Sequence, residues 1–435
     1  RDLLKNYLPA GETLPAVPAA LPVIEIPEFH FHKVAPLFSN LPEAKQTVDI
    51  QPMEQFNQGW GTILYRTTLS ETTLAGTTLK ITEVHDWAQI YADGKLLARL
   101  DRRKGEFTTT LPALKKGTQL DILVEAMGRV NFDKSIHDRK GITEKVELIS
   151  GNQTKELKNW TVYNFPVDYS FIKDKKYSDT KILPTMPAYY KSTFTLDKVG
   201  DTFLDMSTWG KGMVWVNGHA MGRFWEIGPQ QTLFMPGCWL KEGENEILVL
   251  DLKGPTRASI KGLKKPILDV LREKAPETHR KDGEKLKLTG EKVGHEGAFT
   301  PGNGWQEVRF ATPVKGRYFC LEALSPQAND NIAAIAEFDV LGADGKPVSR
   351  EHWKIRYADS EETRSGNRTA DKIFDLQEST FWMTVDNVPY PHQLVIDLSK
   401  VENVTGFRYL PRAEKGYPGM IKEYRVYVKP ADFNY

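Results

Sequence analysis

The sequence predicts an all-β protein with three β-sandwich domains in tandem behind a proline-rich N-terminal strap. Two observations predict this fold. Short apolar runs alternate with turn residues from Gln51 onward, and residues 51–167 show no amphipathic helix of ordinary length. The same order of runs and turns then returns further along the chain at a nearly constant offset, which indicates a duplicated structural unit.

The strap comes first. The chain opens with RDLLKNYLP, which is typical of the last turns of a helix, and residues 11–48 are rich in proline. Proline removes a backbone donor and discourages helix, so we expect an extended segment. Apolar residues such as Phe29 and Phe31 favour a strap that lies on a neighbouring surface over a flexible linker. Because the first residue is Arg1, we interpret the chain as a fragment or a processed piece of a longer protein.

Three landmarks define the duplication, at offsets of 124 or 125 residues. Asp93-Gly94 and Asn217-Gly218 are both predicted hairpin tips, since a type I′ turn requires positive φ at both central residues. The other two landmarks are apolar runs, and the matched pairs are GTILYRTTL (61–69) with PAYYKSTFTL (187–196), and LDILVEAMG (120–128) with ENEILVLDLKG (244–254). We therefore predict one sandwich at 49–168 and a second at 169–255.

A third β unit follows a break in this pattern. Residues 253–290 are rich in Lys, Gly and Pro, with one short helix predicted at Ile267–Glu273, and we assign 256–284 to a linker. From residue 285 to 435 the sequence again reads as strands separated by turns, with a hairpin tip at Asp344-Gly345.

Bulk properties exclude several classes of function. The formal net charge of +1 gives no electrostatic reason to bind nucleic acid or an anionic membrane. No apolar run approaches the length of a transmembrane helix, so we predict no membrane insertion. The two cysteines, Cys238 and Cys320, lie in different parts of the sequence and predict neither a disulfide framework nor a thiolate metal site.

No pattern of residues in this chain predicts catalysis. A glycosidase needs two carboxylates facing each other across the scissile bond, and the one conspicuous acidic cluster is Glu244-Asn245-Glu246. It opens a predicted strand, where such residues solvate a turn. The pairs His85-Asp86 and His137-Asp138 lack a nucleophile elbow and are interpreted as capping or loop residues. The nine histidines show no metal-binding spacing.

The segment DLQESTFW places Asp375, Thr380 and Trp382 in one short loop. Oxygen donors gathered in a loop suit a hard cation such as Ca²⁺, and Glu423 on the last predicted strand could complete the shell. The residue pattern leaves a second interpretation open, in which Asp375 forms an Asx-turn against packed Thr380 and Trp382.

Several motifs resemble the β-domains of glycoside hydrolase family 35 β-galactosidases. They occur in the expected order over residues 1–253: NQGWGTILYRTTL, VHDWAQIYADGK, VEAMGRVNF with DRKGI, PAYYKSTFTL, WGKGMVWVNGHAMGRFW and GPQQTLFMP. In that family a catalytic (β/α)₈ barrel precedes two galactose-binding-like jelly-roll domains. The resemblance therefore implies that residues 1–48 are the exit from a barrel and its linker. It also implies that Trp215 is buried, and that Trp225 is buried or faces the barrel.

Residues 285–435 resemble a discoidin-like domain related to carbohydrate-binding module family 32. The residues that carry this resemblance are AAIAEFDVLGADGK, ADSEETR, the Asp375, Thr380 and Trp382 motif, GFRYLPR and GMIKEYRVYV. The resemblance implies a structural Ca²⁺ held with the help of Asp375, Thr380 and Glu423. It also implies sugar binding by loop residues, for which Arg412 and Tyr417 are the candidates because an Arg fork and an aromatic ring suit a pyranose.

These resemblances imply the non-catalytic C-terminal region of a retaining β-galactosidase that acts on terminal β-galactosides. The two catalytic glutamates of that family lie in barrel motifs that have no counterpart here, so we predict no hydrolysis by this chain alone. The expected partners are the barrel of the parent protein and a galactose-containing glycan. We expect a secreted, periplasmic or cell-envelope location. Two alternatives stay open: a stand-alone carbohydrate-binding or adhesion protein, and a cleaved subunit still bound to its barrel.

Overall fold

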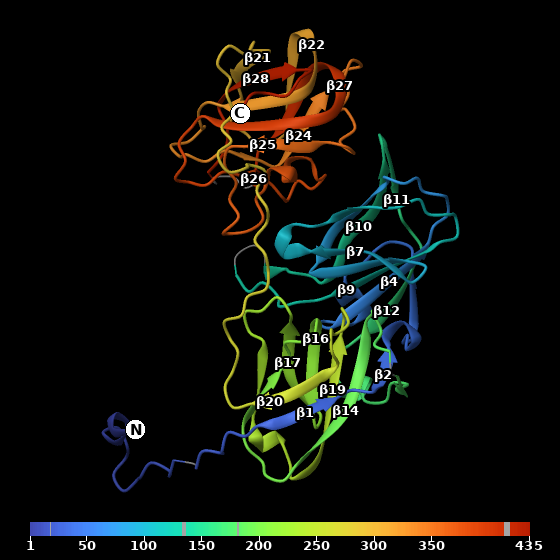
Figure 1. Ribbon diagram of the computed structural model, residues 1–435, viewed down its shortest axis with the longest axis vertical. Helices are drawn as coiled ribbons and strands as arrows, with labels where there is room; N and C mark the ends of the chain where they lie inside the picture. The colour runs from blue at the N-terminus through green and yellow to red at the C-terminus, as the bar shows by residue number, and fades with distance from the viewer. Residues whose placement is uncertain (18, 133–135, 181, 413–417) are drawn as a thin grey trace. The chain divides into compact units, whose positions relative to one another are not determined.

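The computed structural model describes residues 1–17, 19–132, 136–180, 182–412 and 418–435. It confirms an all-β fold of three sandwich domains, with only two short α-helices, α1 (Asp2–Lys5) and α2 (Tyr169–Ile172), among the described residues (Figure 1). Neither helix is long and apolar enough to span a membrane. The chain divides into two compact units, residues 1–41 with 167–273 and residues 42–166 with 274–435, which are described separately below.

The first sandwich consists of two antiparallel sheets, with strand orders β3-β12-β4-β9-β6-β7 and β11-β10-β5-β8. Alternating apolar residues of both sheets meet in one core that includes Tyr65, Ile81, Ile122 and Trp160. The elements are β3 (Ala44–Thr47), η2 (Met53–Phe56), β4 (Thr62–Thr68), β5 (Thr78–His85), β6 (Trp87–Ala92), β7 (Lys95–Asp101), η3 (Arg102–Lys104), β8 (Thr108–Thr110), β9 (Gln119–Glu125), β10 (Gly141–Ser150), β11 (Gln153–Glu156) and β12 (Trp160–Phe165).

The second sandwich also has a six-stranded and a four-stranded sheet, with orders β13-β2-β14-β19-β16-β17 and β1-β20-β15-β18. Its core includes Val34, Tyr190, Trp209 and Val249. The elements are β1 (Ile26–His30), β2 (Lys33–Pro36), η1 (Leu37–Ser39), β13 (Ser178–Asp179), β14 (Ala188–Leu196), β15 (Thr202–Asp205), β16 (Lys211–Val216), β17 (His219–Trp225), β18 (Thr232–Met235), η5 (Gly237–Trp239), β19 (Gly243–Asp251) and β20 (Ser259–Leu263).

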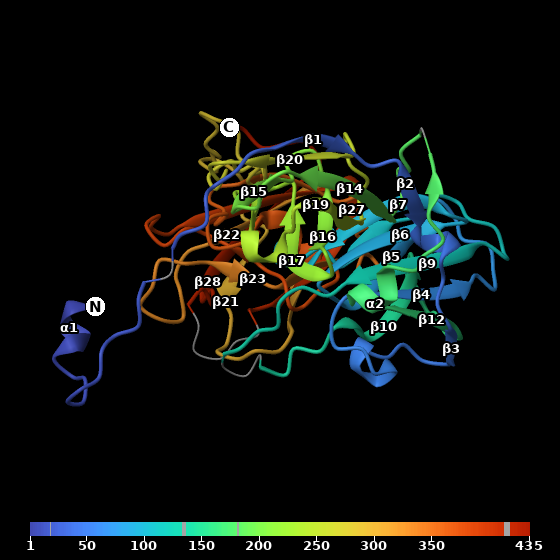
Figure 2. The ribbon, with the colours of Figure 1, turned by 90° about the horizontal axis from the view of Figure 1, so that it is seen from below.

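The two sandwiches have the same spatial order of strands. Some equivalent positions, however, are occupied by a strand that follows the repeated unit in one sandwich and by a strand that precedes it in the other. In the first sandwich the strand beside β4 is β12, which follows β4 in the chain. In the second sandwich the equivalent place beside β14 is taken by β2, which precedes the repeat and belongs to the proline-rich strap. Strand β1 of the strap likewise pairs with β20 at the edge of the smaller sheet (Figures 1 and 2).

The strap is thus an integral part of the second sandwich. Val34 and Ala35 of β2 are buried, and residues 26–36 pair on two sheets. The predicted division of the chain into a strap, two sandwiches, a linker and a third domain stays a prediction. The pairings of β1 with β20 and of β2 with β14 add strands from residues 26–36 and 259–263 to the sandwich expected at 169–255. The helix predicted at Ile267–Glu273 is wrong: this segment is extended, and its Val270 and Arg272 amides donate to Pro229 and Ile227.

The hairpin of β16 and β17 adopts the predicted turn. Asn217 and Gly218 have φ values of 48° and 86°, and Asp93 and Gly94 at the tip of β6 and β7 have 47° and 78°. Trp215 is buried as expected. Trp225 is partly buried, and the Lys211 ammonium lies 4.1 Å from the centroid of its ring.

The third domain is built around two long antiparallel strands, β22 (Gln306–Ala323) and β27 (His392–Leu410), drawn in orange in Figure 1. The main sheet has the order β21-β28-β22-β27-β24, with β25 also paired to β27, and β23 pairs with β26. The remaining elements are β21 (His295–Ala298), β23 (Ala334–Ile335), β24 (Glu337–Leu341), β25 (Lys354–Ala358), η6 (Ala370–Phe374), β26 (Trp382–Met383) and β28 (Glu423–Lys429).

Candidate functional site

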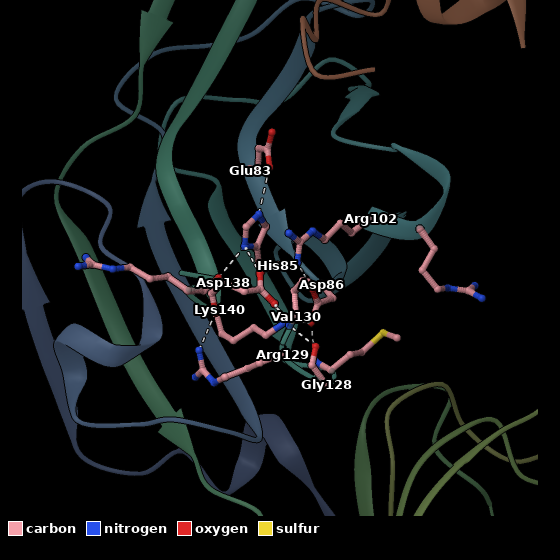
Figure 3. Close-up of polar contacts among 12 residues, drawn as sticks. Glu83, His85, Asp86, Arg102, Gly128, Arg129, Val130, Asp138 and Lys140 are labelled. Carbon is pink, nitrogen blue, oxygen red and sulfur yellow. Dashed lines mark hydrogen bonds and ion pairs between the residues drawn. The ribbon is translucent and has the colours of Figure 1, made fainter. Parts of the chain in front are cut away.

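The connection from β9 to β10 in the first sandwich, residues 126–140, is held by buried charges. We call this segment the 126–140 loop; the structure describes its residues 126–132 and 136–140, and statements about the loop refer to these. It contains GRVNF and DRK of the motifs above. Six ionisable side chains gather at its base, and Figure 3 shows them converging from β5 and the residue after it, from η3 and from the loop itself. We call this set the Lys140 cluster; its members are Glu83, His85, Asp86, Arg102, Asp138 and Lys140.

Lys140 is at the centre of the cluster. Its side chain is 0% exposed, and its Nζ lies 2.6 Å from Asp86 Oδ2 and 2.8 Å from Asp138 Oδ2. The same ammonium donates to the Gly128 carbonyl at 3.0 Å. A buried ammonium loses its hydration, and three close oxygen acceptors replace it. Lys140 therefore joins Asp86, the residue directly after strand β5, to both ends of the loop.

Arg102 of η3 completes the charge balance around the two aspartates. Its Nη1 donates to Asp86 Oδ1 and to Asp138 Oδ1, each at 2.7 Å. Burial alone would raise the pKa of Asp138, but hydrogen bonds from Lys140, Arg102 and the Val130 amide outweigh it and lower the pKa to about 2. Asp138 is therefore ionised under all ordinary conditions.

The two aspartates also bind the backbone of the loop. Asp86 Oδ2 accepts from the Met127 amide at 2.7 Å, and Asp138 Oδ2 accepts from the Val130 amide at 3.1 Å. These contacts give the Met127 and Val130 amides charged acceptors within the protein. The conformation of residues 127–130 thus depends on both carboxylates.

A second set of contacts closes the loop on the other side. Arg129 donates from Nη1 to the Asp138 carbonyl at 2.7 Å and from Nη2 to the Gly59 carbonyl at 2.6 Å. Its guanidinium also lies 2.6 Å from Glu54 Oε1, and the carboxylate of Glu54 accepts from the Lys140 amide. The base of the loop is therefore fixed to η2 as well as to β5.

The loop itself presents apolar side chains to solvent. Phe132 is 79% exposed, Ile136 is 60% exposed and Val130 is 39% exposed. Trp60, which follows the Gly59 carbonyl that Arg129 binds, is 45% exposed. A single exposed apolar residue is ordinary, but four on the described residues of one loop and its neighbour Trp60 are typical of a contact surface.

Sequence reasoning treated His85-Asp86 and His137-Asp138 as capping or loop residues. That interpretation is right for Asp138 as the acceptor for Val130 and for His137, which is exposed. It missed that Asp86 and Asp138 meet around one buried lysine. The signal in the sequence was a Lys directly before a strand that begins with apolar residues, which is a weak indication of a buried ion pair.

In the third domain the structure brings Asp375 and Thr380 together. The Thr380 hydroxyl lies 2.9 Å and 2.8 Å from the two carboxylate oxygens of Asp375, and the Gln377 amide donates to Asp375 Oδ1 at 3.0 Å. These are the contacts of the Asx-turn interpretation. They leave the calcium prediction for the same oxygens untested.

Glu337 of β24 is the carboxylate that sequence reasoning missed here. Burial, followed by the charge of Glu337, raises the pKa of Asp375 to about 8. Glu337 is 2% exposed and forms an ion pair with Arg350, while its Oε1 has no hydrogen-bond partner. Lys372 Nζ lies 3.8 Å from Asp375 Oδ2, so each of the two buried carboxyl groups already has one cationic neighbour. The remaining carboxylate oxygens and the Thr380 hydroxyl are donors of the type that a hard cation binds.

Glu423, the third predicted calcium ligand, is exposed on β28 and accepts from the Ser325 hydroxyl at 2.8 Å. Among the residues that the structure describes, no group of three or more His, Cys, Asp or Glu side chains is arranged to bind a metal ion. The metal set of Asp375, Thr380 and Glu423 therefore stays a prediction, and Glu337 is the additional acidic neighbour of Asp375.

Of the two predicted sugar-binding residues, the structure describes Arg412 only. Its guanidinium lies 4.3 Å from the centroid of the Phe381 ring, and Nη1 lies 3.8 Å from Met383 Sδ. Arg412 is partly buried. Tyr417 lies outside the described residues.

The acidic cluster at 244–246 is engaged in the fold of the second sandwich. Asn245 is fully buried and bonds to the backbone of Lys241 and to Asn217 at the hairpin tip. Glu246 accepts from Tyr169 at 2.7 Å and pairs with Lys191 at 2.5 Å. These side chains organise a turn.

Family models match three parts of the chain. The model for "Beta-galactosidase, first all-beta domain" matches residues 51–166, and "Beta-galactosidase, galactose-binding domain" matches residues 187–245. The model for "F5/8 type C domain" matches residues 357–435. The predicted resemblances, to β-galactosidase β-domains and to a discoidin-like domain, are confirmed.

Curated relatives point the same way. Human beta-galactosidase-1-like protein 2 is 34% identical over 206 residues, which cover 46% of this chain and 30% of that protein. The beta-galactosidase of Xanthomonas manihotis is 33% identical over 226 residues, covering 52% of this chain and 36% of the enzyme. The chain thus spans about a third of the length of these relatives. Among solved structures, the match to the lectin of Pleurotus ostreatus covers 55% of this chain and 82% of the lectin chain at 11% identity. Its TM-score of 0.19 is too low to support an argument about this protein.

Fold and matches together define a multi-domain, all-β protein. More narrowly, the chain carries two parts that match β-galactosidase β-domain models, followed by a part that matches an F5/8 type C domain.

Proposed function

We propose that this chain is the C-terminal region of a retaining β-galactosidase acting on terminal β-galactosides. In this proposal it supports the catalytic barrel through its first two sandwiches and binds a galactose-containing glycan through the third domain. The observation that carries the proposal is the 126–140 loop, since buried ion pairs fix a segment whose apolar side chains face solvent. We infer that this loop, with Trp60, packs against the barrel.

The docking proposal has a direct test. The barrel of the parent protein, produced as a separate polypeptide, should bind this chain, and a chain with Phe132→Ser and Ile136→Ser should bind at least about 10-fold more weakly. The reason is that burying one large apolar side chain contributes roughly 1.5–3 kcal/mol. Leu74→Ser, which removes an exposed leucine from another loop of the same sandwich, is the matched control and should leave binding unchanged.

The chain alone should not hydrolyse β-galactosides. An assay with an aryl β-galactoside should give no turnover above buffer, while addition of the barrel should give turnover. Hydrolysis by the chain alone that disappears in Glu246→Gln would contradict the proposal. In that case the acidic turn at 244–246 would have a chemical role beyond its contacts with Lys191 and Tyr169.

Glycan binding by the third domain rests on Arg412 and Tyr417. A guanidinium fork can bind two sugar hydroxyls, and the packing of Arg412 on Phe381 orients it. Isothermal titration with lactose or a galactose-terminated oligosaccharide should detect binding that Arg412→Ala and Tyr417→Ala both weaken. Binding with unchanged affinity in both variants would refute this assignment.

We further propose a structural Ca²⁺ beside Asp375 and Thr380 in the third domain. The support is the fit of the site: Glu337 has an unpartnered, buried Oε1, and it lies close enough to Asp375 to raise the pKa of that carboxyl. Either Glu337 or the predicted Glu423 supplies the further carboxylate of the calcium shell. The variants Glu337→Gln and Glu423→Gln distinguish these two possibilities. The variant that abolishes calcium binding in a titration identifies the ligand.

A secreted, periplasmic or cell-envelope location agrees with a glycosidase that acts on external glycans. A stand-alone adhesion or carbohydrate-binding protein is the alternative, and glycan binding without any affinity for a barrel would favour it. Mass spectrometry of the native protein would distinguish a separate chain, a cleaved subunit and a region of one longer polypeptide.

A further inference from the structure

A cavity of about 470 Å³ lies in the first sandwich, between the loop that joins β4 to β5, residues 69–77, and the hairpin of β10 and β11 (Figure 1). We call it the 69–77 pocket. Its volume is within the range of small-molecule sites in proteins. The residues that line it all belong to this one domain, and none of them is a member of the Lys140 cluster.

The floor of the 69–77 pocket is aliphatic. It is formed by Leu69, Leu148 and Leu157, which are 2%, 8% and 6% exposed. All three side chains belong to the core of the sandwich, so close packing from below holds them in place. Leu74, which is 69% exposed, extends the apolar surface at the rim. The floor therefore offers a fixed surface to the C–H groups of a ligand.

Hydroxyl groups line the walls on both sides of the pocket. A hydroxyl can donate one hydrogen bond and accept others, so a wall of hydroxyls matches a ligand whose own polar groups both donate and accept. The loop contributes Ser70, Thr72, Thr73 and Thr77, and the hairpin contributes Ser150 and Thr154.

The charges at the pocket compensate each other. Among the lining residues that the structure describes, Glu71 and Lys155 are the charged ones, and they form an ion pair with each other. Lys155 Nζ also lies 3.0 Å from Ser70 Oγ, so this lysine joins the loop to strand β11. Ionic ligands are recognised through complementary charge, whereas these paired charges favour a neutral ligand.

Thr73 is the wall residue whose polar group most needs a partner. It is 8% exposed, and within the part of the chain that the structure describes its hydroxyl has no hydrogen-bond partner. Its amide donates to the Leu114 carbonyl at 2.8 Å, which fixes the residue in the wall. By contrast, the Thr77 hydroxyl donates to the Leu74 carbonyl at 2.9 Å. Leaving a buried hydroxyl without a partner costs free energy, so a ligand that bonds to Thr73 gains what the fold does not supply.

We propose that the 69–77 pocket binds a neutral saccharide of one or two sugar units. A pyranose ring has C–H groups on its faces and hydroxyls around its edge. The C–H groups would lie on the leucine floor, and the hydroxyls would bond to the walls, with Thr73 as one partner. This site gives the first sandwich a binding role besides support of a barrel. It depends neither on the barrel nor on Arg412 and Tyr417 of the third domain.

Methyl NMR of the intact chain locates the binding. The chain is titrated separately with galactose, lactose, cellobiose and maltose. We expect at least one of these neutral sugars to shift the methyl signals of Leu69, Leu148 and Leu157 in a saturable way. The methyl signals of Leu204, in the core of the second sandwich, should stay unchanged.

The substitution Thr73→Val removes the wall hydroxyl and keeps the shape of the side chain. It should weaken saccharide binding about fivefold, because one hydrogen bond is lost. The melting temperature should not fall, because the hydroxyl has no partner within the described protein. Thr62→Val is the matched control: Thr62 is 1% exposed and its hydroxyl likewise has no partner among the described residues, but it does not line the pocket. This variant should bind with wild-type affinity.

Three results would overturn the proposal. The first is the absence of a saturable shift at all three floor leucines with each of the four sugars, which is read from the wild-type chain and does not depend on any variant. The second is equal affinity of Thr73→Val and Thr62→Val. The third is tighter binding of galacturonate than of galactose, because the site would then recognise charge. Shifts confined to the third domain would refute the 69–77 pocket and leave the glycan site proposed there intact.

Discussion

The Nζ atom of Lys140 lies 2.6 Å from Oδ2 of Asp86, although 54 residues separate the two in the sequence. Lys140 is the last residue of the 126–140 loop, and Asp86 directly follows strand β5. Each would be costly to bury alone, so the two residues stabilise the first sandwich only as partners. This relationship fixes the C-terminal end of the loop to the domain.

Replacing Lys140 with methionine should destabilise the first sandwich by about 3 kcal/mol. Methionine fills a similar volume, but it leaves Asp86 and Asp138 buried with Arg102 as their remaining shared cation. Urea unfolding followed by tryptophan fluorescence measures the change. The matched control is Lys145→Met, because Lys145 pairs with Glu147 with 43% of its side chain exposed and should cost less than about 1 kcal/mol. Equal losses in both variants would contradict the central role of Lys140.

Asp138 should make stability depend on acid pH. Its pKa is about 2 in the folded protein and near 3.8 in the unfolded chain, so its contribution is present above pH 4 and is lost as pH falls through 2. That difference corresponds to about 2 kcal/mol. The gap in unfolding free energy between wild type and Asp138→Asn should therefore narrow from pH 6 to pH 2. A gap that stays constant over this range would show that Asp138 does not titrate as expected.

Truncation of the strap should separate a dispensable part from an essential part. Removing residues 1–21 should leave the second sandwich folded, since these residues precede β1 and those that the structure describes form no strand. Removing residues 1–37 deletes β1 and β2, exposes the edge of β14 and uncovers the core around Tyr190, so we expect aggregation or loss of the cooperative transition. Circular dichroism and light scattering compare the two proteins. A folded, monomeric chain without residues 1–37 would mean that the strap only covers the sandwich.

Calcium should stabilise the third domain. At 100 times the dissociation constant, a ligand that binds the folded state alone contributes about 2.7 kcal/mol, so a chelator should lower the melting temperature of this domain by several degrees. Asp375→Asn should melt at the same temperature with and without calcium. An unchanged melting temperature of the wild-type domain after chelation would argue against the ion and in favour of the Asx-turn that Thr380 and Asp375 form.

Much of the fold followed from local chemistry. The type I′ turns at Asp93-Gly94 and Asn217-Gly218 depend on two adjacent residues that tolerate positive φ, and this preference is visible in any sequence. The duplication was visible because three landmarks recur at a nearly constant offset of 124 or 125 residues. The place of β2 was not predictable in the same way, because pairing between Val34 and Tyr190 joins segments more than 150 residues apart.

The candidate site was less accessible to sequence reasoning. Asp375 and Thr380 are near each other in the chain, so a shared loop was predicted and found. Glu337 comes to Asp375 from strand β24, which is distant in the chain, and nothing in its local sequence distinguishes it from an exposed strand residue. The short helix expected at Ile267–Glu273 failed because backbone bonds to Ile227 and Pro229 compete with local helix formation.

By itself, the sequence determined the all-β class, the duplicated unit, the hairpin tips and the resemblance to β-galactosidase β-domains, since each depends on residues close together in the chain or on a repeated order. Tertiary structure decided that the strap completes the second sandwich and that Asp86, Asp138 and Lys140 meet beneath the 126–140 loop. The physical reason is burial. From sequence alone, a charged residue is predicted to lie on the surface. Only the tertiary structure shows the oppositely charged neighbours that allow it to be buried.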